Sequence, residues 1–156
     1  MTNENFMQHA VDLARECMRA NKGGPFGAVI VRDGSIVAEG WNEVTSTNDP
    51  TAHAEVVAIR RACARLGTFQ LSDCEIYASC EPCPMCLGAI YWARLRTLYY
   101  ANTREEAAAI GFDDEFIYRE MPLVPAARVI PGVSLRMPQS QALFAEWAAK
   151  PDKITY

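Results

Sequence analysis

The first forty residues change from a helical to a strand-like pattern of apolar positions. Apolar residues three or four apart predict an amphipathic helix over residues 4–20, and they are Phe6, Ala10, Leu13, Ala14 and Cys17. Gly23-Gly24-Pro25 ends this pattern. Two short apolar runs, 27–31 and 36–38, then flank Asp33-Gly34, a dipeptide typical of hairpin turns. We therefore expect a helix followed by a β-hairpin.

The middle of the chain predicts a second helix and then a strand–helix–strand unit. Asp49 is the candidate N-cap of the second helix, Pro50 is its first residue and Gly67 marks its end. The elements expected next are a strand (75–79), a helix from Glu81-Pro82 to about Ala93, and a strand (97–101). A strand, a helix and a strand at this spacing favour parallel pairing of the two strands.

The last third is more weakly patterned. We expect two short helices (103–109 and 113–120), a β-prone run (129–135) and a final helix from Ser140. The whole order predicts an α/β fold, a three-layer α/β/α sandwich around a mixed central sheet. A chain of 156 residues is also of a usual length for one domain, here 1–156.

Charge and hydropathy narrow the class of ligand. The formal net charge is −4, and Lys occurs only at positions 22, 150 and 153. Nucleic-acid binders usually show a basic stripe, so we expect a small-molecule ligand and no nucleic acid. No apolar stretch is long enough to span a membrane, and the N-terminus lacks the basic flank and apolar run of a signal peptide. We therefore expect no membrane association and a cytoplasmic location.

The six cysteines fall into two groups. Cys17, Cys63 and Cys74 lie in apolar-patterned stretches and are expected to be buried free thiols. Cys83 and Cys86 lie three apart at the beginning of a predicted helix, so their sulfurs share one face of its first turn. This spacing suits tetrahedral zinc, and the helix N-terminus favours the thiolate that a metal requires.

Three other uses of these cysteines fit the sequence less well. A thioredoxin-like redox pair needs only two thiols, whereas Cys80 and Cys83 form a second, overlapping Cys-x-x-Cys. A ferredoxin cluster would place a further cysteine at position 90, which is Ile90. A structural zinc site would need four protein ligands, and His9 lies in no partner motif.

His53 favours a catalytic zinc site. The segment His53-Ala54-Glu55 lies 30 residues before Cys83, and His-x-Glu followed by Pro-Cys-x-x-Cys is typical of zinc deaminases. Three protein ligands, His53, Cys83 and Cys86, leave a fourth position for water, so we expect one zinc ion per chain. Two thiolates cancel the charge of the ion, so a carboxylate must accept the proton of that water. Glu55 is the candidate for this role.

With these residues, the chain resembles the cytidine-deaminase-like family of zinc deaminases, and within it the bacterial guanine deaminases. Blocks 23–28, 48–55 and 79–93 carry the resemblance to the family, which also includes cytosine and tRNA-adenosine deaminases. The segment Gly111-Phe112-Asp113-Asp114 and the final Tyr156 look like the guanine deaminase branch. The resemblance implies the cytidine-deaminase-like fold and hydrolysis of guanine to xanthine and ammonia. Guanosine, the triazine ammeline and cytosine are alternative substrates, and a structural zinc-binding module is the non-enzymatic alternative.

The resemblance also implies roles for further residues. The implied substrate-binding residues are Phe26, Asn42, Ala54, Trp92 and Tyr156, and Asp114 is the implied second proton carrier beside Glu55. The alternatives are core aromatics for Phe26 and Trp92, a turn residue for Asn42, and a helix cap for Asp114, with Asp113 as its competitor. In the family, the C-terminal segment, here 139–156, crosses to the partner subunit of a homodimer. We therefore expect a domain-swapped homodimer in which Tyr156 reaches the partner's active site.

Overall fold

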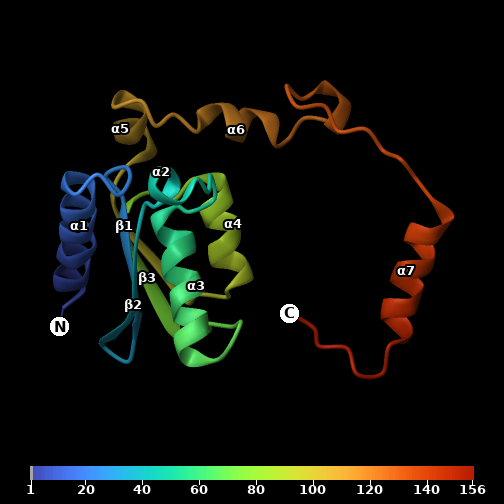
Figure 1. Ribbon diagram of the computed structural model, residues 1–156, viewed down its shortest axis with the longest axis horizontal. Coiled ribbons are helices and arrows are strands. Elements are labelled where there is room, and N and C mark those ends of the chain that lie inside the picture. The colour runs from blue at the N-terminus through green and yellow to red at the C-terminus, as the bar shows by residue number, and fades with distance from the viewer. Residues whose placement is uncertain (1) are drawn as a thin grey trace. The chain divides into compact units, whose positions relative to one another are not determined.

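The computed structural model describes residues 2–156, and two compact units are found in it, Met1–Asp114 and Glu115–Tyr156. The elements of the first unit are α1 (Asn3–Arg19), β1 (Gly27–Arg32), β2 (Ser35–Trp41), α2 (Val44–Thr47), α3 (Ala54–Leu66), β3 (Cys74–Cys80), α4 (Pro84–Trp92), β4 (Thr97–Asn102) and α5 (Arg104–Ala109) (Figure 1). The second unit holds α6 (Glu115–Glu120), the 3-10 helix η1 (Pro125–Ala127) and α7 (Pro138–Ala149).

The sheet of the first unit has four strands in the order β2-β1-β3-β4. Strand β1 pairs antiparallel with β2 and with β3, whereas β3 and β4 are parallel and are joined through α4. The predicted hairpin, the parallel pair and the mixed sheet are therefore confirmed.

Strand β1 shows why the sheet needs helices on both faces. Ala28 and Ile30 pack in one buried cluster with Ala58 of α3, while Val29 packs in another with Phe6 of α1. Successive side chains of a strand point to opposite faces, so a continuous apolar run requires cover on each side. Figure 1 shows α1 on one face of the sheet and α3 with α4 on the other, which confirms the three-layer α/β/α sandwich.

Gly40 in β2 allows α3 to approach the sheet closely. A Cβ atom at this position would lie 2.2 Å from the carbonyl oxygen of Ala54 and 2.5 Å from the amide nitrogen of Ala58. Contacts this short are impossible, so only glycine permits the first turn of α3 to lie against β2. The N-terminus of α3 is thereby placed at the edge of the sheet where β2 ends.

Several sequence-based boundaries were wrong. Helix α3 begins at Ala54, with His53 as its N-cap, because Pro50 and Thr51 form a turn. Helix α4 begins at Pro84 with Cys83 as its N-cap, and α7 begins at Pro138 rather than Ser140. The β-prone run 129–135 pairs with no strand of the described residues 2–156. This run contains Pro131, which has no N–H to donate to a ladder, and Gly132.

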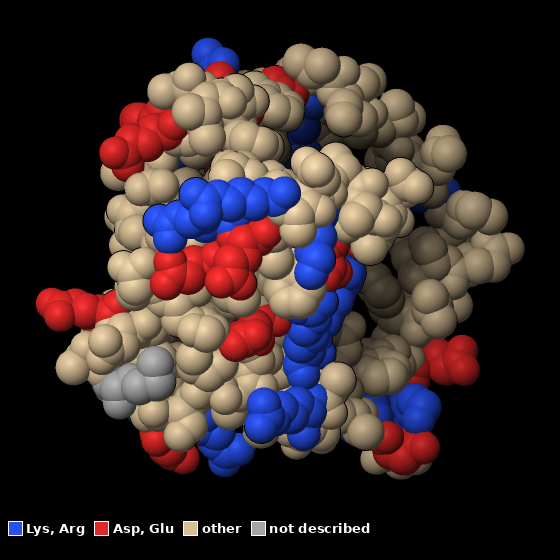
Figure 2. Space-filling model, turned by 60° about the vertical axis from the view of Figure 1, so that its left-hand side comes forward, with Lys and Arg blue, Asp and Glu red and all other residues tan. Residues whose placement is uncertain are grey.

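Charged side chains of both signs lie next to one another on the molecular face in Figure 2. Among the described residues, ion pairs join Arg15 to Asp12, Arg61 to Glu43 and Arg96 to Glu75. Within residues 2–156, no helix has both the length and the apolar character that a bilayer crossing requires.

Candidate active site and metal centre

Two helices direct their N-termini at the same place and carry the three predicted metal ligands. His53 is the N-cap of α3 and Cys83 is the N-cap of α4, and both have extended backbone conformations. Cys86 is the third residue of α4 and is buried. The first N–H groups of a helix carry partial positive charge, so two such ends favour anionic ligands and a reaction that develops negative charge.

The ligand atoms have the separations that tetrahedral zinc demands. The Nδ1 atom of His53 lies 3.5 Å from the Sγ atom of Cys83 and 3.5 Å from that of Cys86. All three candidate ligand atoms lie within 4.8 Å of one another. Bonds of about 2.3 Å to sulfur and about 2.0 Å to nitrogen place these atoms roughly 3.5 Å apart at a tetrahedral angle. The donor set and its geometry therefore fit zinc.

Ionisation of one of the two thiols, Cys83 or Cys86, disfavours ionisation of the other. A hydrogen bond from Cys86 lowers the pKa of the Cys83 thiol to about 4, against the opposing effect of burial. The same contact raises the pKa of Cys86, as do its burial and the nearby Glu55. One thiolate thus forms readily, and a second at this place requires a cation. A divalent metal ion supplies that charge.

Glu55 lies beside the ligands and does not belong to the ligand set. Its Oε2 atom accepts a hydrogen bond from the Cys86 Sγ atom at 3.5 Å, and its side chain is buried. Burial raises the pKa of this carboxyl group above its usual range. A carboxyl group with a raised pKa holds a proton more readily than an ordinary carboxylate, which suits a group that accepts and returns a proton as a general acid–base catalyst does.

The other cysteines and His9 stand apart from the metal centre. The Cys80 Sγ atom donates to the carbonyl oxygen of Thr103 at 3.6 Å, and burial raises the pKa of this thiol to about 11. All six cysteines are free thiols, with Cys17 and Cys74 buried as predicted and Cys63 only half-buried. His9 pairs with Glu39 at 2.7 Å, between α1 and β2. None of these groups competes with the three ligands.

Asn42, the residue after β2, lies close to Phe26, the residue before β1. The amide nitrogen of Asn42 donates to the carbonyl oxygen of Phe26 at 3.1 Å, and the Asn42 side chain is buried. The ring of Phe26 meets that of Phe112 edge to face, with 4.8 Å between centroids. No role was expected for Phe112 from the sequence, although it lies in the segment 111–114. Its contact with Phe26 holds that segment against the site.

The 111–114 segment places its two aspartates differently. Asp114 is half-buried and Asp113 is exposed. Desolvation raises the pKa of Asp114, and Cys83 is near enough to contribute in the same direction. The structure therefore brings Asp114 into the electrostatic environment of the metal ligand Cys83.

Residues 1–102 match the family model described as the cytidine and deoxycytidylate deaminase zinc-binding region. The chain belongs to this family. The guanine deaminase of Bacillus subtilis (strain 168) is 53% identical to it over 156 residues, which cover 100% of both chains. The X-ray structure of guanine deaminase from Bacillus subtilis superposes with a TM-score of 0.98, covering 100% of this chain and 99% of that one.

Two further relatives cover a smaller part of this deaminase. A structure of the guanine deaminase from Nitrosomonas europaea has a TM-score of 0.70 at 37% identity and covers 72% of this chain and 65% of that one. The tRNA-specific adenosine deaminase of Agrobacterium fabrum is 41% identical over 106 residues, 68% of this chain and 69% of its own. The protein is therefore a zinc-dependent hydrolytic deaminase of the cytidine-deaminase-like fold. Membership of this family of enzymes excludes the interpretation of the chain as a non-enzymatic zinc-binding module.

Two predicted substrate-binding residues of the deaminase, Trp92 and Tyr156, follow the metal ligands in the chain. Trp92 ends α4, six residues after Cys86, and 67% of its surface is exposed, which excludes the core aromatic interpretation. Six residues of helix amount to about 9 Å along its axis. Tyr156 belongs to the second unit. Ala54, by contrast, is the first residue of α3 and is buried next to His53.

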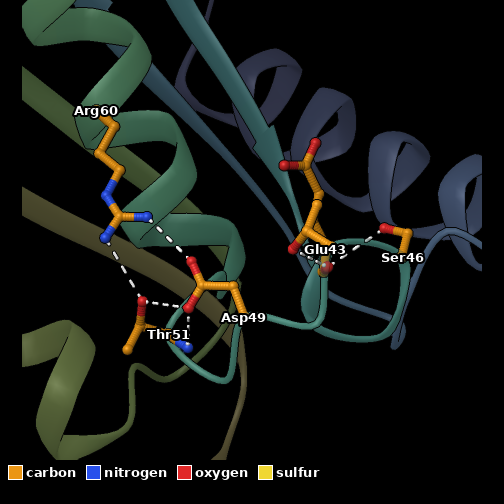
Figure 3. Close-up of polar contacts among 6 residues, drawn as sticks. Glu43, Ser46, Asp49, Thr51 and Arg60 are labelled. Atoms are coloured by element: carbon orange, nitrogen blue, oxygen red, sulfur yellow. Dashed lines mark hydrogen bonds and ion pairs between the residues drawn. The ribbon is translucent and has the colours of Figure 1, made fainter.

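The loop before His53 is held by polar contacts within the deaminase (Figure 3). Asp49 accepts hydrogen bonds from the amide nitrogen of Thr51 at 2.8 Å and from its hydroxyl group at 2.7 Å. Arg60 of α3 contacts the Asp49 carboxylate at 3.4 Å. These hydrogen bonds from Thr51 and the nearby Arg60 hold the pKa of Asp49 below its usual range. Asp49 therefore stabilises a turn that delivers His53, rather than capping α3 itself.

Proposed function

We propose that the protein hydrolyses guanine to xanthine and ammonia. The observation that carries the proposal is the 53% identity to a guanine deaminase over 100% of both chains, where the match to a tRNA-specific adenosine deaminase covers 68% of this chain. The net charge of −4 supports a small purine ligand over a polynucleotide.

The geometry around Glu55 supports a mechanism based on two proton transfers. Bound zinc supplies a nucleophile at neutral pH by lowering the pKa of water. The Glu55 carboxylate accepts a proton from the attacking water and passes it to a ring nitrogen of the substrate. The water oxygen bonds to the amino-bearing carbon. The remaining proton of the water, now on the hydroxyl group bound to this carbon, is then transferred to the amino group, so that the carbonyl group forms, the carbon–nitrogen bond breaks and ammonia is released.

Four residues of the first unit are proposed to hold the purine ring. Phe26 packs against one ring face, and Asn42 bonds to a ring edge. The amide N–H of Ala54, which lies at the N-terminus of α3, meets the substrate carbonyl. Trp92 is proposed to contact the ring as well, and its exposure on α4 is compatible with a role at a subunit boundary.

Steady-state ammonia release with a panel of substrates tests the proposal. Guanine, guanosine, ammeline, cytosine and adenine would be compared at equal concentrations with the zinc-loaded enzyme. We expect the highest kcat/KM with guanine. A higher value with guanosine would show that the site accepts a ribose and would replace guanine as the proposed substrate.

Asp114 is proposed as the second proton carrier, near the departing amino group. Asp114→Asn keeps the size of the side chain but removes its proton transfer, so we expect kcat to fall by about tenfold or more. Asp113→Asn is the matched control, because Asp113 is the adjacent and more exposed aspartate. A larger loss of kcat in the Asp113 variant would reverse the assignment.

We further propose a homodimer in which the C-terminal segment 139–156 is exchanged and Tyr156 contacts the partner's ring site. Within α7, Leu143, Phe144 and Trp147 are exposed, and so are Tyr91 and Trp92 of α4. Large exposed apolar side chains such as these are typical of surfaces that another chain covers. Exchange of an identical element between subunits is a known route to dimers.

Deleting residues 153–156 tests the role of the C-terminus. We expect a folded, zinc-loaded protein whose guanine turnover falls by about tenfold or more, because a group that positions the substrate is lost. Lys153→Ala is the control, since it leaves Tyr156 in place. Full activity of the shortened protein, or a monomer by sedimentation at the assay concentration, would refute the proposed exchange.

A cytoplasmic location is proposed on the chemistry of the ligands. All six cysteines are free, and a Cys83 or Cys86 locked in a disulfide could not hold a metal. Compartments that keep thiols reduced suit such a site.

A further inference from the structure

A cluster of three side chains surrounds the backbone that presents Asn42. Arg61 of α3 donates from Nη1 to the carbonyl oxygen of Glu39 at 3.0 Å and from Nη2 to the Glu43 carboxylate at 2.6 Å. Its guanidinium group also lies 4.1 Å from the centre of the Trp41 ring. We call Arg61, Trp41 and Glu43 the Arg61 clamp. It contacts the chain on both sides of Asn42.

The Arg61 clamp connects the segment around Asn42 to the helix that carries the metal ligand His53 and Glu55. Strand β2 is an edge of the sheet, so its outward carbonyl groups have no strand partner. Arg61 provides one such group with a donor and simultaneously forms an ion pair one residue beyond Asn42. A planar guanidinium group can make both bonds while stacking on an aromatic ring, which an ammonium group cannot do.

Glu43 extends the clamp to the loop before His53. Its amide nitrogen donates to the carbonyl oxygen of Ala52 at 2.9 Å. Its own carbonyl oxygen accepts hydrogen bonds from the hydroxyl groups of Ser46 and Thr47, and the contact with Ser46 is drawn in Figure 3. The position of Glu43 is therefore fixed by its side chain and by both polar atoms of its backbone.

The side chain of Asn42 has only one orientation that satisfies its surroundings. Its Oδ1 atom accepts from the amide nitrogens of Gly24 at 3.3 Å and Val44 at 3.2 Å. Two N–H donors facing this atom require an oxygen there, so the amino group is the end that faces away. Within residues 2–156 that amino group donates to no protein atom, and it is not closed off from solvent. It is thus available as a hydrogen-bond donor to a ligand.

We propose that Arg61 is a positioning residue for substrate recognition. By holding the carbonyl of residue 39 and the carboxylate of residue 43, it sets where the amino group of Asn42 lies, and so how well that group meets an acceptor atom on the purine edge. The inference rests on the proposed function, because it takes Asn42 to contact the ring. Arg61 itself contacts no substrate.

The test compares two arginines of the same helix. Arg65 also donates to a backbone carbonyl of β2, that of Val37 at 2.9 Å, but at the end of the strand remote from Asn42. In Arg61→Met we expect KM for guanine to rise about 5- to 10-fold, the scale of one hydrogen bond, with zinc content and kcat largely retained. Arg65→Met should leave KM unchanged. Arg61→Lys, which keeps the charge, should raise KM less than Arg61→Met does.

A double-mutant cycle with Asn42→Ala separates positioning from general stability. If Arg61 acts through Asn42, Arg61→Met should have little further effect on KM once Asn42 is alanine. A normal KM in Asn42→Ala alone would overturn the proposed role of Asn42, whatever Arg61 does. If Asn42→Ala does raise KM, two results would overturn the positioning role. One is that Arg61→Met leaves KM unchanged in the otherwise wild-type enzyme. The other is that the effects of the two substitutions on KM multiply fully in the double variant.

Discussion

Replacing Glu55 with glutamine is expected to leave zinc bound and to lower guanine turnover by ~10²-fold or more. Glutamine has the size of glutamate but cannot accept a proton from water. Glu55 lies beside Cys86 and outside the group of three ligand atoms, so the metal centre should survive the change. Turnover would be measured as ammonia release, and zinc by elemental analysis of the same preparation.

The control for this variant is a glutamate that is remote from the reaction. Glu75 lies near the start of β3, at the opposite end of the strand from Cys80, and is paired with Arg96 at 2.8 Å. Glu75→Gln should therefore retain near-normal kcat. Near-normal turnover in Glu55→Gln itself would remove Glu55 from the mechanism, whereas loss of zinc in that variant would show that the carboxylate supports the metal.

Replacing either Cys83 or Cys86 with serine is expected to abolish most zinc binding and, with it, activity. Each sulfur lies 3.5 Å from the Nδ1 atom of His53 and belongs to the group of three candidate ligands found within residues 2–156. A serine hydroxyl group does not ionise as a thiol does. Its C–O bond is also shorter than the C–S bond of cysteine, so it cannot replace a thiolate that binds zinc at about 2.3 Å. Zinc content per chain and thermal unfolding would both be measured, since a metal that binds only the folded state stabilises it.

Cys80 offers a matched control in the same short segment. Its sulfur donates to the carbonyl oxygen of Thr103 and lies outside the ligand group. We expect Cys80→Ser to keep one zinc ion per chain and most of the activity. Loss of zinc from the Cys80 variant, with retention in the Cys83 variant, would overturn the ligand assignment.

The position of the metal centre also explains why this α/β fold suits the chemistry. Two helices that begin at the same end of the sheet deliver three ligands and a buried carboxylate to one point. Each helix is held by close packing, as at Gly40, where β2 and the first turn of α3 are in contact. Ligands placed on such packed elements stay within the narrow limits that a tetrahedral metal requires.

The amino-acid sequence by itself determined the local elements and the chemistry. The helical spacing of Phe6 to Cys17, the Asp33-Gly34 turn and the βαβ spacing depend on neighbours in the chain, and each was confirmed. The sequence also predicted the candidate ligands His53, Cys83 and Cys86 and the candidate proton carrier Glu55, because zinc chemistry restricts the residue types and their spacing.

Only the tertiary structure decided how distant segments meet. The turn at Asp49 and Thr51 that makes His53 an N-cap is contacted by Arg60 of α3, which lies eleven residues beyond Asp49. The contact of Phe112 with Phe26 depends on packing between segments more than eighty residues apart, and Asp114 lies near Cys83 only in the folded chain. Run 129–135 has strand propensity but no ladder partner, so it forms no strand. A local pattern states what a segment can form, whereas the partners that satisfy its backbone and side chains are supplied by the rest of the fold.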